Sequence, residues 1–504
     1  MDEQFQNNPP EPKKGNEGRR ASFIWIAATL CLAGVFILVS ASRVEAQSRE
    51  EDSQRYTAII QQVFNFIQRR FVEESDPQAL YEGAMRGMFE ALGDPYSVFL
   101  SEAEMADLSE TTQGSFGGVG LYISKPIGEG PGGAPPYVEV ASPIEDTPGW
   151  RAGINPGDLI ISINGESTDK LTMDEVLARL RGEPGVQVNL VIRRSERLEF
   201  PVTLVRAVIE VPTVKYDMIG DIGYLKIITF TPMTVDRARE AIEFFKTKNY
   251  RSLVVDLRNN YGGLLESAIG ISDLFLDGGI VVSTKSRIPQ ENMVRNARRN
   301  TAVPAAMPIV VLINRGSASA SEIVAGALKD RGRAYLVGEK SFGKGSVQQV
   351  YPIDGASGFK LTTARYYTPS DVNIDKVGIP PDLEVRFPEY GPEIEEALGN
   401  LIRSNRIPEF VKANPRPQTA QIEALVRELN RDFQIDSALL RRLIRNEQNR
   451  TVIAPVYDLD YDVQLQAAVN ILRDGSYARL IRTTRTLRDL QEEAEKEDDM
   501  AKAS

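Results

Sequence analysis

From Ile222 onward the sequence alternates short apolar runs with amphipathic stretches, and this alternation constrains the fold more than any other feature of the chain. Apolar runs of this length are typical of buried strands and the stretches between them of helices, an order that favours a largely parallel α/β sheet. The predicted strands span residues 252–257, 308–313 and 334–337, and the predicted helices span residues 235–248 and 321–329. We assign residues 207–387 to this α/β core.

Two further folded segments precede the core. Residues 54–104 repeat apolar side chains at helical spacing and predict a helical segment. Residues 105–206 combine short β-like runs with one helix, which Thr172 and Glu175 begin in capping-box spacing, so they predict a small α+β domain. After residue 388 come charge-rich helical stretches, and residues 491–504 are acidic and polar enough to predict a disordered tail.

The N-terminus predicts a membrane anchor. Residues 21–42 carry no charge and are long enough to cross a hydrocarbon core of roughly 30 Å, whereas residues 1–20 predict a disordered cytoplasmic tail. Four Lys and Arg residues between positions 13 and 20 predict that the N-terminus stays in the cytoplasm and the bulk of the protein lies outside it. A cleaved signal peptide, processed near Ala46, is the alternative.

Composition excludes several classes of chemistry. The 504 residues contain no histidine, so a Ser-His-Asp triad and a histidine-based zinc site are both excluded, and we expect no metal and no cofactor. The single cysteine, Cys31, lies in the predicted spanning segment, which excludes a disulfide within one chain and a catalytic thiol in the folded region. A net charge of −11 argues against nucleic acid as a partner.

A strand, a turn of small residues and a helix follow one another between Pro308 and Asp330. Such a corner can hold a serine at the mouth of a sheet, facing the free N–H groups of the helix N-terminus. Ser319 is the best placed of the three serines because Ala318 and Ala320 leave space for a substrate backbone. A turn that merely allows close packing remains the alternative interpretation of this segment.

Lys344 stands between two glycines in the segment 338–347. The segment resembles a phosphate-binding loop, but Gly345 replaces the required hydroxyl residue and a β-like run follows instead of a helix, which argues against nucleotide binding. A Ser-Lys dyad needs a neutral lysine, and burial can lower the pKa of a lysine from about 10.4 toward about 7. Gln348 could position the amine without stabilising its charge, whereas an acidic neighbour would raise the pKa of the lysine.

The segment 256–263 follows a predicted strand and ends in two glycines. The N–H of Gly262 or Gly263, together with that of Ala320, could stabilise a developing oxyanion. A plain glycine turn, with Asp256 and Arg258 in a structural ion pair, is the alternative.

Together the segments GSASASEI, FGKGSVQQ and LRNNYGG resemble the carboxyl-terminal processing proteases, in which the catalytic serine and lysine lie 25 residues apart, as Ser319 and Lys344 do. The resemblance runs from about Ile59 to Val385 and implies a crotonase-like ββα core with a mixed sheet. It implies that Ser319 is the nucleophile, Lys344 the general base and Gln348 the residue that orients the lysine. The sequence departs from the family at Asp371, where glycine is usual.

Residues 105–206 resemble a PDZ domain, because Gly117, Gly118, Val119, Gly120 and Leu121 match a carboxylate-binding loop. Backbone N–H groups of such a loop bind a terminal carboxylate while the peptide adds as a strand. Residues 458–490 resemble the closing helical segment of the family, so residues 388–457 are a helical insertion. We expect the region 388–504 to serve oligomerisation or an adaptor, or to be a solvated decoration.

The resemblance therefore implies a serine endopeptidase that binds the C-terminal tails of extracytoplasmic proteins and cleaves them. We expect a single-pass protein of the bacterial inner membrane with its catalytic region on the periplasmic side, or a periplasmic protein if a signal peptide is removed. A non-catalytic PDZ scaffold on a protease-like fold is the alternative function, and an acyl-CoA enzyme is a further one because of the crotonase-like core.

Overall fold

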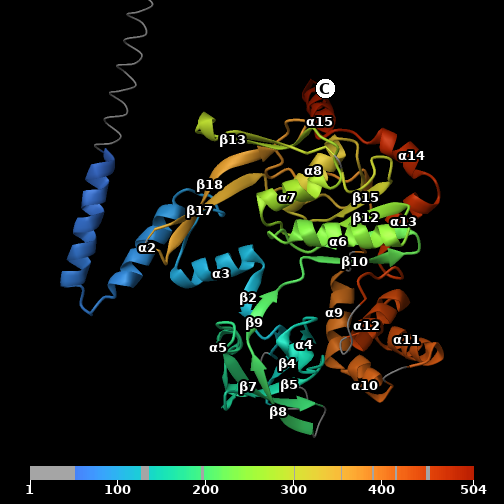
Figure 1. Ribbon diagram of the computed structural model, residues 1–504, viewed down its shortest axis with the longest axis horizontal. Helices are drawn as coiled ribbons and strands as arrows, with labels where there is room; N and C mark the ends of the chain where they lie inside the picture. Colours follow the sequence, from blue (N-terminus) through green and yellow to red (C-terminus); the bar gives the residue numbers. More distant parts are fainter. Residues whose placement is uncertain are drawn as a thin grey trace, which may run out of the picture. The chain divides into compact units, whose positions relative to one another are not determined.

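The computed structural model describes residues 52–126, 135–194, 198–299, 301–353, 355–388, 391–414, 417–449 and 455–503, with side chains up to residue 496. The chain divides into an N-terminal unit that ends at Gly93 and a larger unit that begins at Asp94 (Figure 1). The predicted tail 1–20 and the predicted spanning segment 21–42 lie outside the described residues. Within the described ranges, no helix has both the length and the apolar character needed to cross a membrane.

The N-terminal unit is helical, as the spacing of its apolar residues predicts. It contains a helix over residues 52–70 and helix α2 (Pro77–Glu90). Asp76 begins α2 because its side chain accepts a hydrogen bond from the N–H of Gln78 at 3.0 Å. The predicted segment 54–104 continues into the larger unit, where it includes a short strand, β1 (Val98–Leu100), and the start of helix α3 (Glu102–Gln113).

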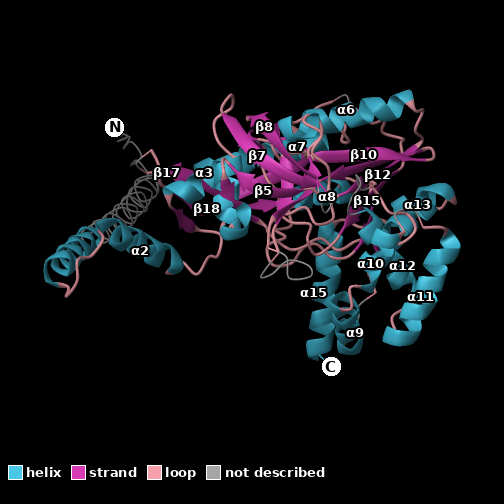
Figure 2. Ribbon diagram, turned by 90° about the horizontal axis from the view of Figure 1, so that it is seen from below, coloured by secondary structure: helices cyan, strands magenta, loops and turns pink. Residues whose placement is uncertain are grey.

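A six-stranded sheet forms the centre of the larger unit, and the three strands predicted with bounds match β12, β15 and β16 to within about one residue. Its order is β10 (Val214–Ile219), β11 (Ile222–Ile227), β12 (Ser252–Asp256), β15 (Ile309–Ile313), β16 (Tyr335–Gly338) and β19 (Leu383–Glu384). The strands from β11 to β19 are parallel and β10 is antiparallel, so the sheet is mixed. Figure 2 labels β10, β12 and β15 of this sheet, in which β11 lies between β10 and β12.

Helices cover both faces of this sheet, which explains why its strands are apolar throughout rather than alternating. On one face, side chains such as Val255 and Val311 pack against α6 (Thr234–Thr247), α7 (Leu265–Asp273) and α8 (Ala320–Asp330). On the other face, Val254 and Val310 pack against α13 (Val463–Arg473). The small-residue turn between β15 and α8 therefore lies at the carboxyl end of a buried parallel strand.

A second sheet carries the segment that follows Lys344. Its order is β1, β18 (Gly358–Tyr367), β13 (Ile280–Ser286) and β14 (Met293–Asn296), and β17 (Ser346–Pro352) pairs with β18; a short turn, η3 (Pro289–Glu291), joins β13 to β14. The β17–β18 register shifts between Val347 and Gln348, which is a bulge next to the candidate site.

The predicted α+β domain is inserted through a two-stranded ribbon in which β2 (Ser115–Gly118) pairs with β9 (Ala207–Glu210). Its sheet has the order β3 (Leu121–Ser124), β4 (Val138–Pro143), β5 (Leu159–Ile163), β7 (Gln187–Arg194) and β8 (Leu198–Val205), with β6 (Glu166–Ser167) beside β5. Its helices are α4 (Pro148–Arg151), η2 (Thr168–Lys170) and α5 (Met173–Leu180). The domain has a hydrophobic core of its own.

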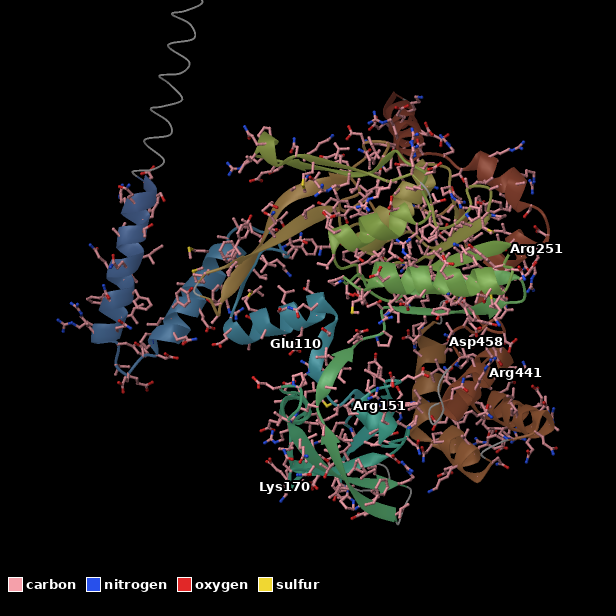
Figure 3. All side chains as sticks on the ribbon, viewed as in Figure 1. Glu110, Arg151, Lys170, Arg251, Arg441 and Asp458 are labelled. Atoms are coloured by element: carbon pink, nitrogen blue, oxygen red, sulfur yellow. The ribbon has the colours of Figure 1, made fainter. Side chains whose placement is uncertain are left out.

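The predicted insertion 388–457 is helical and also has its own core. It contains α9 (Pro392–Arg403), α10 (Arg406–Ala413), α11 (Thr419–Phe433) and α12 (Ser437–Asn449). Besides the apolar contacts, Arg441 on α12 forms an ion pair of 2.7 Å with Glu423 on α11; Figure 3 labels Arg441.

The C-terminal segment corrects one prediction. After α13 come α14 (Tyr477–Leu480), η4 (Ile481–Thr483) and α15 (Leu487–Ala503), so the predicted disordered tail 491–504 is helical as far as Ala503. The first turn of α15 anchors it, because Leu487 is buried in the central core and its N–H donates to Asp330 at 2.8 Å. Polar contacts along the helix, such as Gln491 to Glu495 at 3.0 Å, then extend it.

Candidate active site

The small-residue turn between β15 and α8 is held against the loop that follows β12. The hydroxyl of Ser317 donates to the carbonyl of Leu257, and the hydroxyl of Ser321 donates to the carbonyl of Asn260, each at 2.8 Å. Ser317 and Ser321 are buried. Two of the three serines thus have structural roles, which leaves Ser319 as the candidate nucleophile.

Ser319 is the residue that precedes α8, and its backbone is strained. Its φ of 55° and ψ of −112° lie outside the regions that residues with a side chain adopt readily. Such conformations cost about 1–3 kcal/mol and cluster at functional sites. The surrounding contacts hold Ser319 in this conformation, at the sharp corner that the sequence pattern predicts.

A buried carboxylate joins this turn to the Lys344 segment. One oxygen of Glu322 accepts hydrogen bonds from the N–H groups of Ser319 and Lys344, both at 2.9 Å. The other oxygen accepts from the N–H of Gly343 at 2.7 Å and from the hydroxyl of Ser341 at 2.5 Å. Because two backbone nitrogens share one acceptor atom, the main chains of Ser319 and Lys344 must lie close together.

The position of Glu322 has opposing effects on its own charge. Burial raises the pKa of the carboxyl group, and the four hydrogen bonds oppose that rise, with a net pKa above the ordinary value. All four partners donate, an arrangement that suits the ionised carboxylate. Sequence reasoning did not assign a role to Glu322, although the spacing Ser-x-x-Glu from Ser319 is a capping-box signal.

Lys344 is half-buried, and its surroundings lower its pKa. Burial is the largest cause and the positive charge of Lys360 adds to it, whereas Asp94 and Glu322 act in the opposite direction. No carboxylate among the described residues forms an ion pair with Lys344; the ring of Tyr96 lies 4.7 Å from its ammonium instead. Acidic neighbours are thus present, but desolvation outweighs them.

The structure gives Gln348 contacts other than the predicted one. Its amide nitrogen donates to the hydroxyls of Ser346 at 2.9 Å and Thr362 at 3.2 Å, and no hydrogen bond joins it to Lys344. These contacts fix Gln348 at the bulge of β17, four residues after Lys344 in the sequence. Its predicted orienting role stays a prediction.

Of the two glycines predicted as oxyanion donors, Gly262 lies against the turn that contains Ser319 and Ala320, and Gly263 lies next to it in the chain and against Phe230. A Cβ atom added to Gly262 would lie 2.8 Å from the Cβ of Ser319 and 3.0 Å from the nitrogen of Ala320, so only glycine fits there. The N–H of Gly262 already donates to the side chain of Asn260 at 2.9 Å. The N–H groups of Gly263 and Ala320 have no hydrogen-bond partner in the described part of the chain, so they are the better candidates.

The same loop also contains the structural ion pair of the alternative interpretation. Arg258 binds Asp256 through two hydrogen bonds of 2.9 and 2.6 Å and Asp462 through two of 2.8 and 2.6 Å. Asp462 precedes α13, so this network attaches the closing helix to the end of β12. No three acidic or cysteine side chains among the described residues lie close enough together to hold a metal ion.

The loop before β3 has the features that carboxylate binding requires. The N–H groups of Val119 and Gly120 have no partner within the described ranges, and β3 is an edge strand beside which a peptide could add. Gly120 has a φ of 75°, and a Cβ atom there would lie 2.3 Å from the Cβ of Thr147. Glycine is therefore required at this position.

Comparison with known proteins agrees with this geometry. The chain matches Peptidase family S41 over residues 221–385, a PDZ domain over residues 139–194 and the activating protease CtpB N-terminal domain over residues 28–104. These matches define a serine-type peptidase with a PDZ domain.

Among individual relatives, the chain is 39% identical over 366 residues to the carboxy-terminal-processing protease of Bartonella bacilliformis, which covers 71% of this chain and 82% of the relative. It is 32% identical over 368 residues to the carboxy-terminal processing protease CtpA of Bacillus subtilis, which covers 73% of this chain and 77% of the relative. The chain belongs to the carboxy-terminal processing proteases of peptidase family S41.

Proposed function

We propose that this peptidase cleaves protein substrates with Ser319 as the nucleophile and neutral Lys344 as the general base. The observation that supports this most directly is the shared Glu322 oxygen, which brings the backbones of Ser319 and Lys344 together. The lowered pKa of Lys344 adds to it, since a base must lose its proton to act.

In this mechanism, Lys344 takes the proton of Ser319 while the serine oxygen attacks the substrate carbonyl carbon. The N–H groups of Gly263 and Ala320 stabilise the oxyanion, and the lysine then delivers the proton to the leaving amine. Water attacks the resulting ester, and its proton passes through Lys344 back to the serine oxygen. Gln348 would orient the lysine once substrate is bound.

We also propose that the PDZ domain binds the C-terminal tail of the substrate at Val119 and Gly120, where unpartnered N–H groups precede an edge strand. A terminal carboxylate would accept hydrogen bonds from these groups, and the preceding residues would pair with β3. Blocking the carboxylate as an amide should then weaken binding.

The test uses an unfolded protein substrate with a free C-terminus. Ser319→Ala and Lys344→Ala should each abolish cleavage and retain folding and tail binding, and a serine-directed phosphonate should label the wild type at Ser319. Cleavage by either variant would contradict the dyad. A substrate with an amidated C-terminus should bind more weakly to the inactive Ser319→Ala protein, and equal binding would contradict the role of the PDZ loop.

For the cell, we propose that residues 21–42 anchor the protein with its catalytic region outside the cytoplasm, and that the region 388–504 binds an adaptor or a second copy. The uncharged run at 21–42 supports the first and the separate helical core supports the second. Membrane fractions extracted with alkaline carbonate should retain the protein, and release into the soluble fraction would favour the cleaved form. A pull-down with Ser319→Ala, with and without residues 391–454, tests the second.

A further inference from the structure

Tyr366 places a buried hydroxyl group at the candidate site without a hydrogen-bond partner. Its side chain is 2% exposed, and its hydroxyl has no partner among the described residues. Its backbone is firmly held, because the N–H donates to the carbonyl of Gly345 at 2.9 Å and the carbonyl accepts from Asn373 at 2.8 Å. The backbone of Tyr366 therefore lies against Gly345, the residue that follows Lys344. Its side chain belongs to the same buried core cluster as Ala320, the residue that follows Ser319.

The groups that act electrostatically on this hydroxyl belong to the site or lie next to it. Burial is the largest cause that raises the pKa of Tyr366 well above its ordinary value, and the charges of Glu322, Asp375 and Tyr96 add to it. The side chain of Ser319 acts in the opposite direction, as a neighbouring hydroxyl does, although the two oxygens do not have the geometry of a formed hydrogen bond. The Tyr366 hydroxyl thus keeps its proton throughout the working pH range.

Glu322 is not a free acceptor for this proton. Both of its oxygens already receive two hydrogen bonds, from the N–H groups of Ser319, Gly343 and Lys344 and from the hydroxyl of Ser341. The Ser319 oxygen is the neighbouring acceptor whose negative charge rises during the reaction. A phenylalanine would fill the same space without burying an unpaired hydroxyl.

We infer that Tyr366 is a further catalytic residue, whose hydroxyl donates a hydrogen bond to the Oγ of Ser319 while that oxygen carries developing negative charge. This inference rests on the proposed function of Ser319. As the O–H bond of Ser319 breaks, its proton goes to the nitrogen of Lys344 and its electron pair forms the bond to the substrate carbon. In deacylation the ester bond breaks, and the oxygen leaves with that electron pair before it regains a proton from Lys344. Tyr366 keeps its own proton in both steps.

A hydrogen bond formed only during the reaction should affect kcat and leave KM unchanged. We therefore expect Tyr366→Phe to lower kcat roughly 10- to 100-fold, as the loss of one donor to a developing charge does. KM should change less than about twofold, and the rate of labelling by a serine-directed phosphonate should fall with kcat. The melting temperature should stay the same or rise, because the variant no longer buries an unpaired hydroxyl.

Tyr250→Phe is the matched control. Tyr250 is 7% exposed, its hydroxyl is likewise buried without a partner, and the charged groups that influence it are Glu243 and Arg333, which do not belong to the site. This variant removes the same atom from the same core and should keep the wild-type kcat. A kcat within twofold of wild type for Tyr366→Phe, or an equal loss in Tyr250→Phe, would overturn the inference.

The outcomes also separate this inference from the proposed function. If Ser319→Ala still cleaves substrate, the proposed function fails; if Ser319→Ala is inactive and Tyr366→Phe is fully active, only the inference fails. Should Tyr366→Phe not fold, 3-fluorotyrosine at position 366 tests the same point, because its hydroxyl is a stronger donor. A higher kcat would support the inference, and an unchanged kcat would overturn it.

Discussion

Glu322 shows how one buried residue can hold two segments of a candidate site together. Its carboxylate receives hydrogen bonds from both the turn that contains Ser319 and the Lys344 segment. A small-residue corner and a lysine between glycines are local signals, so the sequence singles out Ser319 and Lys344 as candidates. The resemblance of their segments to the family implies their roles, which stay predictions. Of the two hydroxyl partners of Gln348, Ser346 lies two residues away on the same strand. Thr362 lies on the neighbouring strand β18, and no spacing along the chain predicts that contact.

The charge of Glu322 gives the first prediction. Activity should rise with pH as Lys344 loses its proton, and the negative charge of Glu322 raises the pKa of that lysine. Glu322→Gln removes the charge, so the pKa of Lys344 should fall and the ascending limb of the pH–rate profile should move to lower pH. The amide also disrupts the hydrogen bonds to both backbones, so kcat should fall roughly 100-fold.

Glu339→Gln serves as the control for this measurement. Glu339 pairs with Arg315 at 3.5 Å and is not among the groups that shift the pKa of Lys344. The ascending limb of the pH–rate profile of Glu339→Gln should coincide with that of wild type. If the ascending limb of the pH–rate profile of Glu322→Gln stays in place or moves to higher pH, the Glu322 carboxylate does not raise the pKa of Lys344.

Asp371, where the sequence departs from its family, has a structural explanation at the same scale. Its φ of 62° is a left-handed conformation, which explains why glycine is usual there. The side chain forms ion pairs with Lys285 at 2.5 Å and with Arg488 of α15 at 3.7 Å. Aspartate is among the residues that tolerate this conformation.

At the scale of elements, the central strands are predicted well and their partners poorly. Runs such as 252–257 are apolar because both faces of the sheet are covered, a local property of the sequence. The second sheet pairs β1 with β18, which lies more than 250 residues later in the chain. The sequence of neither strand indicates which strand it pairs with. Helix α15 is missed because its polar composition conceals the anchoring contacts of Leu487 and Asp330.

The attachment of α13 to β12 gives the second prediction. Arg258 is 8% exposed and Asp256 is fully buried, so Arg258→Met would leave a buried carboxylate without its partner. Loss of one partner of a buried pair costs about 3–5 kcal/mol, and we expect the free energy of unfolding of the core to fall by that amount. Arg295→Met, which removes an exposed pair of 3.2 Å with Glu266, should cost less than about 1 kcal/mol.

The pair of Asp256 and Arg258 also determines how the loss of unfolding free energy in Arg258→Met depends on pH. Burial alone would raise the pKa of Asp256, but Arg258 outweighs it and the pKa lies below its ordinary value. The stabilisation is therefore present above the unfolded pKa of about 3.9 and is lost as pH falls through the folded value. Denaturant unfolding should show the largest difference between wild type and Arg258→Met near neutral pH, with a narrower gap below about pH 4. If the difference in unfolding free energy between wild type and Arg258→Met grows as the pH falls, this account is contradicted.

At the scale of the whole molecule, the chain carries several hydrophobic cores. The PDZ domain and the helical insertion each bury a separate cluster, distinct from the clusters on the two faces of the central sheet. The change to short β-like runs predicts the PDZ domain, whereas the helical insertion is predicted by the resemblance of residues 458–490 to the closing segment of the family. The sequence does not predict that the PDZ domain enters and leaves through one ribbon, because β2 and β9 are short and far apart along the chain.

Separate cores give the third prediction. Leu440 is fully buried in the core of the helical insertion, so Leu440→Asp should unfold the insertion alone. In calorimetry, one transition should disappear while that of the protease core moves by less than about 2 °C, and cleavage of an unfolded substrate should continue. Ile402→Asp changes a side chain that is 73% exposed on α9 and should leave every transition in place. Loss of the core transition in Leu440→Asp would show that the two cores fold together.

The strained backbone of Ser319 lowers the stability of the folded protein at the position that the proposed mechanism needs for reactivity. A residue with a β-carbon adopts the positive φ of this corner at a cost in free energy, whereas glycine adopts it without steric strain. Ser319→Gly should therefore yield a protein that cannot react yet resists heat better than its parent. Selection for heat resistance alone would therefore favour glycine at this position, and under the proposed function only the need for a nucleophile opposes that change.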